Sequence, residues 1–107
     1  MKMLHIVCGK RLEDEILTLF DELGIKGYTV IHGVGGRGAT GIVSDTAPDT
    51  GPHASTNTLF MVALGYEATF LPRIIAALKE LRASHIQGHD DRAIPLKVFL
   101  QPCEIIM

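Results

Sequence analysis

Apolar and β-favouring residues are grouped in short runs along the chain, and these runs predict four β-strands. The runs lie at residues 3–8, about 27–32, 58–64 and 96–100. Gly65 follows the third run directly and is expected to end that strand. Pro102 interrupts the fourth run, and residues 104–106 are expected to form a short terminal strand.

Between the first two runs, apolar residues recur at the spacing of an α-helix. This stripe consists of Leu12, Ile16, Phe20 and Leu23. Glu13, Asp14 and Glu15 lie in its first turn, where the helix dipole favours negative charge. Gly24 follows the stripe and is the residue type that commonly ends a helix in a left-handed conformation. The sequence therefore predicts one amphipathic helix in this segment.

A second helix is predicted between the last two strands, beginning near Ala68 or Thr69. Its apolar stripe consists of Phe70, Ile74, Leu78 and Leu81. Pro72 is compatible with the first turn, where a missing N–H costs nothing. Basic side chains gather toward the other end, where the helix dipole favours them: Lys79, Arg82 and His85.

The predicted order is strand, helix, strand, long loop, strand, helix, strand, which is the α+β ferredoxin-like βαββαβ pattern. Right-handed crossovers would place both helices on one face of a four-stranded antiparallel sheet. The opposite face would be bare, and its strands contain few charges. A bare apolar face is usually covered by another subunit, so a homo-oligomer is expected.

Composition indicates one soluble domain spanning residues 1–107, with 47% apolar and 21% charged residues. The formal net charge is −2 and there is no tryptophan, which argues against a nucleic-acid-binding module. No apolar run is long enough to span a membrane, and the N-terminus does not have the form of a signal peptide, so a cytoplasmic location is expected. Cys8 and Cys103 are far apart in sequence and are expected to be buried apolar residues rather than a redox or metal pair.

The most distinctive segment follows the second predicted strand, where four glycines fall between residues 33 and 38. Glycine backbones allow several amide N–H groups to converge on an anion, and Arg37 lies among them. Three of these glycines spell the dinucleotide-binding pattern G-x-G-x-x-G, but residues 39–56 are rich in turn formers and cannot open the helix which that motif requires. A glycine-rich segment, called the lip below, at the start of a long loop of about residues 38–57 fits this stretch better than a dinucleotide-binding motif. A flexible hairpin base without a ligand is the simpler alternative.

Metal and catalytic sites are weakly supported. The five histidines show no strong metal-ligand spacing, although His85 and His89 are four apart. Asp90 and Asp91 are adjacent in a turn and are expected to be solvated, and no nucleophile elbow is present. The sequence predicts no enzyme and no metal site.

Three consecutive features form a recognisable arrangement: the strand beginning Gly27-Tyr28-Thr29-Val30, the lip Gly35-Gly36-Arg37-Gly38 and the long loop. A strand–helix–strand unit follows them. The chain resembles the PII and PII-like signalling proteins over nearly its whole length. Its glycine-rich stretches look most like the PII-like branch associated with carboxysomes and bicarbonate transport. The long loop corresponds to the T-loop of that family.

The resemblance implies a cytoplasmic homotrimer that binds an adenine nucleotide in each cleft between subunits. Gly27, Tyr28 and Thr29 would then flank the base or ribose. The lip would meet the phosphates through Gly35, Gly36, Arg37 and Gly38. The turn after the second helix would complete the site through Gly88, His89, Asp90 and Arg92, with Asp91 between them, and Lys97 could point into the same cleft. The T-loop would report the ligand to an unknown transporter or enzyme.

Two departures from the nitrogen-regulatory members bear on the ligand. No tyrosine lies between Arg37 and Asn57, so the usual site of uridylylation is missing. The turn at residues 88–92 is not the family's Gly-Lys-rich form, which favours ADP or AMP over ATP. A small anion such as bicarbonate is expected near Arg37. The alternatives are a metal-binding, CutA-like trimer associated with metal efflux, using His53 and His89, and a purely structural trimer.

Overall fold

The computed structural model describes residues 1–35, 37–38, 41–42, 57–65, 69–85 and 96–107. The main strands are β1 (Lys2–Gly9), β2 (Thr29–Val34), β5 (Asn57–Leu64) and β6 (Leu96–Pro102). The helices are α1 (Glu13–Leu23) and α2 (Phe70–Ser84), with a 3₁₀ turn at Lys10–Leu12 leading into α1. Two short strands, β3 (Arg37–Gly38) and β4 (Gly41–Ile42), follow β2.

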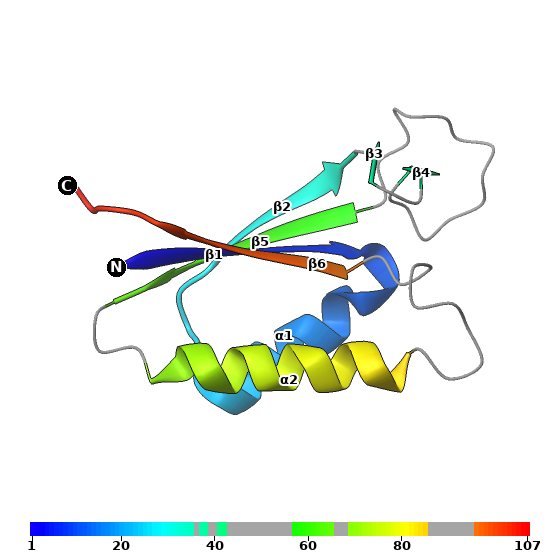
Figure 1. The fold of residues 1–107 in the computed structure, drawn as a ribbon, viewed down its shortest axis with the longest axis horizontal. Coiled ribbons are helices and arrows are strands. Elements are labelled where there is room, and N and C mark those ends of the chain that lie inside the picture. The colour runs from blue at the N-terminus through cyan, green and yellow to red at the C-terminus, as the bar shows by residue number, and fades with distance from the viewer. Residues whose placement is uncertain (36, 39–40, 43–56, 66–68, 86–95) are drawn as a thin grey trace.

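The four main strands form an antiparallel sheet in the order β2-β5-β1-β6. Both helices lie against one face of this sheet, and no helix among the described residues lies on the other face (Figure 1). The ferredoxin-like prediction is therefore confirmed, together with the placement of both helices on one side. β2 and β6 are the two edges of the sheet.

The core lies between the sheet and the helices, and its residues come from the apolar runs and stripes of the sequence. It includes Leu4, Ile6, Cys8, Ile16, Phe20, Phe60, Val62, Ile74 and Leu78. Phe20 of α1 meets Phe60 of β5 edge to face, with ring centroids 5.5 Å apart. Edge-to-face packing is a favoured aromatic geometry, and it adds to the hydrophobic gain from burying both rings. Cys8 is buried, as predicted, and Cys103 is half-buried.

Helix α1 ends at Gly24, which has φ 76° and lies in the left-handed region. Its amide donates hydrogen bonds to the carbonyls of Asp21 and Phe20, which satisfies acceptors that the last turn would otherwise leave open. This is the ending that the sequence predicted. Helix α2 begins at Phe70, close to the predicted start, and Pro72 lies in its first turn.

Strand register assigns the side chains of the uncovered sheet face, which the sequence left open. Leu4 pairs with Val62 and Leu100 on the helix side, so the odd-numbered positions of β1 face the other way. We call the uncovered side the open face. Its side chains are Met3, His5, Val7, Thr29, Ile31, Leu59, Met61, Ala63, Lys97, Phe99 and Gln101. Most are apolar, and Phe99 is 58% exposed.

Three details differ from the sequence-based expectations. Strand β2 begins at Thr29, two residues later than predicted, because its pairing with β5 begins at Thr29↔Met61. Strand β6 continues through Pro102, which is tolerated because β6 is an edge strand. Residues 104–106 form no strand, so that prediction was wrong.

Candidate functional site

Strand β2 carries a β-bulge immediately before the glycine-rich lip. Its pairing with β5 shifts between His32 and Val34, and the intervening Gly33 has φ 73°. A bulge of this kind commonly places a glycine in the left-handed conformation and bends the strand. The bulge therefore sets the direction in which the chain leaves the sheet.

A hydrogen-bonded network fixes the root of this exit. Nε2 of His32 lies 2.5 Å from Oε1 of Glu13, and the hydroxyl of Thr58 donates to Oε2 of Glu13 at 3.1 Å. His32 is the last residue of β2 before the bulge, Glu13 begins α1, and Thr58 is the second residue of β5. One carboxylate thus joins three elements at the point where the long loop leaves and re-enters the sheet.

The sequence pattern did not reveal this network, because the helix dipole alone accounts for acidic residues at 13–15. His32 and Thr58 are 19 and 45 residues away from Glu13 along the chain, and no local pattern signals these contacts. A second histidine is tied to the same acidic cluster, because Nε2 of His85 lies 2.7 Å from Oε2 of Glu15. That contact joins the C-terminal end of α2 to the first turn of α1.

The proposed base and ribose residues lie along the outer edge of the sheet. Tyr28 packs its ring on the helix side, against Phe20 and Phe60, and is 38% exposed. Thr29 faces the opposite side, where it pairs with Met61. A methyl group built on Gly27 would meet nothing within 4 Å in the single chain. The edge of β2 is therefore accessible from both sides.

The proposed phosphate residues are only partly described. Arg37 and Gly38 form β3, which pairs with β4 in the register Arg37↔Ile42 and Gly38↔Gly41. Gly35 is exposed at the end of β2. The remaining site residues lie outside the described residues: Gly36, Gly88, His89, Asp90, Asp91 and Arg92.

For the metal-binding alternative, the described residues contain no cluster of three His, Cys, Asp or Glu side chains. His53 and His89, which the metal-binding alternative requires, lie outside the part of the chain that the structure describes. The two described histidines that contact carboxylates, His32 and His85, each contact a single carboxylate of the described residues.

The comparison with protein families identifies the chain. The family model described as "Nitrogen regulatory protein P-II" matches residues 1–104. The chain belongs to the P-II family. Members of this family are regulatory proteins, and the resemblance inferred from the sequence is confirmed.

Solved structures of PII-like proteins share the fold of this P-II family member. CPII from Thiomonas intermedia K12, bound to ADP, AMP and bicarbonate, is 19% identical with a TM-score of 0.56, and the match covers 94% of this chain and 82% of CPII. A PII-like signaling protein from Thermus thermophilus is 19% identical with a TM-score of 0.54, covering 94% and 83% of the two chains. No match was found among curated proteins. None of the described helices of this P-II protein is both long and apolar enough to span a membrane.

Proposed function

We propose that this P-II protein is a cytoplasmic trimeric regulator that binds ADP or AMP in the clefts between its subunits, with bicarbonate beside the nucleotide. The bound state would be relayed to a transporter or enzyme through the long loop between β2 and β5. The fold shared with CPII, whose structure holds ADP, AMP and bicarbonate, supports this choice of ligands. The role is regulatory rather than catalytic.

The exposed open face is the observation that carries the proposal. Apolar side chains such as Leu59, Met61 and Phe99 cover a sheet surface that neither of the described helices protects. Contiguous apolar surface of this kind favours association with further copies. Nε2 of His5, on the same face, is buried within the single chain and has no hydrogen-bond partner among the described groups.

Association would also complete the nucleotide site. Gly27 and Tyr28 directly precede the edge strand β2 of one subunit and Thr29 begins it, and the lip and the turn at 88–92 would come from its neighbour. Backbone amides of glycines suit phosphate oxygens because no side chain obstructs their approach. Arg37 would add a guanidinium that donates two parallel hydrogen bonds to a phosphate or to bicarbonate.

The relay would act through the root of the loop. Ligand contacts with the lip would favour one arrangement of the loop and offset the entropy of ordering it. The network of Glu13, His32 and Thr58 holds the root in place, so that ordering begins from a fixed anchor.

Titration calorimetry with AMP, ADP, ATP and cyclic AMP, each with and without bicarbonate, tests the ligand. ADP or AMP is expected to bind, and Arg37→Ala is expected to weaken binding about tenfold or more through loss of a charge-assisted contact. Arg73→Ala is the matched control, because Arg73 is exposed on α2. The absence of heat with every nucleotide would overturn the proposal, as would a monomeric mass by light scattering.

A further inference from the structure

Two connections that the proposed nucleotide site would use begin at the same end of the molecule. The long loop runs from β2 to β5, and a second connection runs from α2 to β6. Figure 1 shows that the end of β2, the end of α2 and the start of α1 all lie at this end. Strand register agrees, because Asn57 at the start of β5 pairs with both Gly9 and Val34. Leu96, the first residue of β6, pairs with Cys8 beside them.

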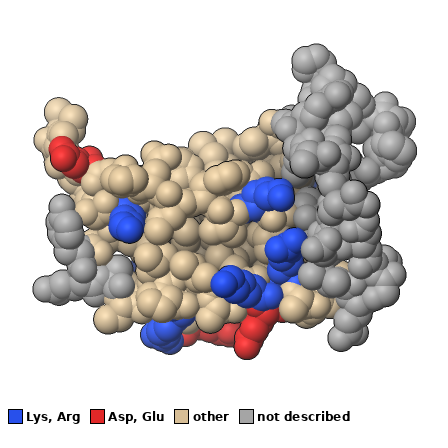
Figure 2. Space-filling model, in the orientation of Figure 1, with Lys and Arg blue, Asp and Glu red and all other residues tan. Residues whose placement is uncertain are grey.

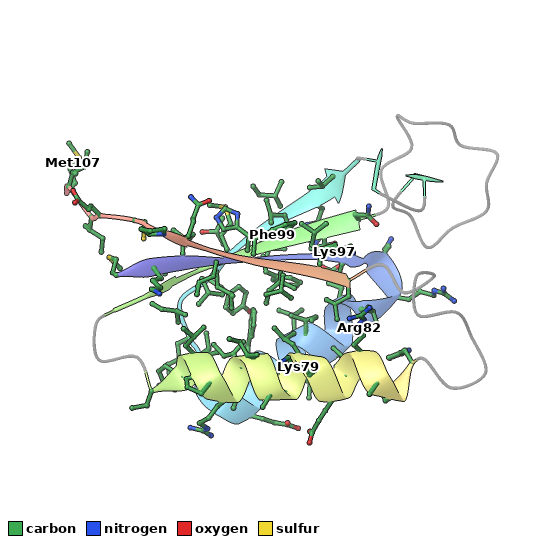
Figure 3. All side chains as sticks on the ribbon, viewed as in Figure 1. Lys79, Arg82, Lys97, Phe99 and Met107 are labelled. Atoms are coloured by element: carbon green, nitrogen blue, oxygen red, sulfur yellow. The ribbon has the colours of Figure 1, made fainter. Side chains whose placement is uncertain are left out.

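This end of the molecule is also suited to phosphate groups. Figure 2 shows a group of basic side chains close to it. Figure 3 shows that Lys79 and Arg82 extend from the C-terminal half of α2 and that Lys97 lies near the start of β6. Clustered positive charge raises the local concentration of anionic ligands. A nucleotide bound at this end would therefore meet a favourable field.

The first turn of α1 contacts the described residues at which both connections begin, which we call their roots. Nε2 of His32 lies 2.5 Å from Oε1 of Glu13, next to the bulge from which the long loop leaves β2. Nε2 of His85 lies 2.7 Å from Oε2 of Glu15. His85 is the residue that caps the C-terminal end of α2, directly before the second connection. One helical turn thus holds two roots through two histidine–carboxylate contacts.

Helix geometry explains how a single turn reaches both roots. Glu13 and Glu15 are two residues apart, so their side chains point about 200° apart around the helix axis. Glu13 points toward the sheet, where its side chain is 15% exposed and also accepts a hydrogen bond from Thr58. Glu15 points toward α2 and is 47% exposed. The two glutamates therefore serve separate elements.

The turn is fixed to the core on both sides of these glutamates. Leu12 precedes Glu13 and Ile16 follows Glu15, and both apolar side chains are buried. Buried side chains in a close-packed interior have little freedom to move. The turn consequently offers both histidines a rigid partner.

We propose that Glu13 and Glu15 are positioning residues for the proposed nucleotide site. Glu13 acts through His32 on the root of the long loop, and Glu15 acts through His85 on the root of the second connection. Holding both roots on one rigid turn fixes their spacing and reduces the entropy lost when a nucleotide binds. This inference rests on the proposed function, because it concerns the affinity of that site.

Calorimetry with ADP on the full chain tests the positioning role. His32→Ala and His85→Ala are each expected to weaken binding about threefold, because each removes a contact with a carboxylate near the surface. The double variant should bind about tenfold more weakly, because contacts that hold separate roots add in free energy. His32→Gln and His85→Gln keep an N–H donor and should restore the affinity of the unmodified protein.

Asp14→Ala is the matched control, because it removes the exposed carboxylate between the two glutamates. It should leave ADP affinity unchanged. Hydrogen exchange of the protein without nucleotide gives a second measurement. Exchange should rise in residues 29–35 for His32→Ala and in residues 80–85 for His85→Ala. Circular dichroism and light scattering check that each variant keeps its fold and its oligomeric mass.

The possible failures separate this inference from the proposed function. Unchanged ADP affinity or unchanged hydrogen exchange in both alanine variants would overturn the positioning role and leave the nucleotide site standing. The same holds if the glutamine variants fail to restore affinity, or if Asp14→Ala weakens binding equally. A double variant that binds as well as either single variant would overturn the assignment of one root to each pair. A failure of ADP to bind the unmodified protein would overturn the proposed function, and the positioning role with it.

Discussion

Nε2 of His32 and Oε1 of Glu13 lie 2.5 Å apart, although the two side chains have very different surroundings. The His32 side chain is 67% exposed, whereas that of Glu13 is 15% exposed and also accepts a hydrogen bond from the buried Thr58. The contact therefore ties an exposed ring just before the bulge in β2 to an anchored carboxylate. Because the anchor is Glu13, the two partners should contribute unequally to stability.

We expect Glu13→Ala to destabilise the protein by about 1–3 kcal/mol, because it leaves the Thr58 hydroxyl without its acceptor. His32→Ala should cost less, about 0–1 kcal/mol, since an exposed pair contributes little. Urea denaturation followed by circular dichroism measures both. Asp14→Ala is the control, because it removes another first-turn carboxylate from an exposed position. Equal losses for Glu13→Ala and Asp14→Ala would show that the helix dipole, rather than the network, explains Glu13.

The end of α1 allows the effect of backbone conformation on stability to be tested without a change in steric contacts. Gly24 has φ 76°, and a methyl group built there would meet nothing within 4 Å. Gly24→Ala should therefore cost about 1–2 kcal/mol from the left-handed conformation alone. Gly27 has similar free space and no positive φ, so Gly27→Ala should change the free energy of unfolding by less than about 0.5 kcal/mol. Equal losses in denaturant titrations of the two variants would contradict this assignment.

The open face provides a test of assembly. Met61 pairs with His5 and Thr29 in the middle of this face. We expect Met61→Glu to convert the proposed trimer into monomers, because each interface would have to bury a charge without a partner. The fold should persist, because Met61 faces away from the helices, and circular dichroism would check this. Met61→Leu is the control and should remain trimeric by light scattering. A trimer that survives Met61→Glu would place the subunit contacts elsewhere.

Local patterns in the sequence predicted most of the fold. Strands at 3–8 and 58–64, the amphipathic stripe of α1 and its glycine ending required only periodicity and the conformational preference of Gly24. The late start of β2 was not predictable in this way, because it depends on where the pairing with β5 begins. The continuation of β6 through Pro102 likewise depends on its position at the edge of the sheet.

The candidate site was predictable only in part. Four glycines after a strand pointed to the lip, but the bulge at Gly33 depends on pairing with β5, which the sequence does not reveal. The contacts of Glu13 with His32 and Thr58 depend on tertiary structure for the same reason. Strand register was also needed to identify the open face, since a shift of one residue would exchange its side chains with those of the core.

The bulge links the fold to the proposed ligand site, so a substitution at Gly33 should affect both. Gly33 has φ 73°, and Gly33→Ala is expected to cost about 1–2 kcal/mol because an L-residue is disfavoured there. The strain can be relieved by removing the bulge, which would redirect Val34 and the lip that follows it. We therefore expect weaker ADP binding by calorimetry as well as lower stability in urea. Gly65→Ala, which has no positive φ and open space around it, is the control for both measurements. Unchanged ADP affinity in a destabilised Gly33→Ala protein would separate the bulge from the ligand site and confine its role to the sheet.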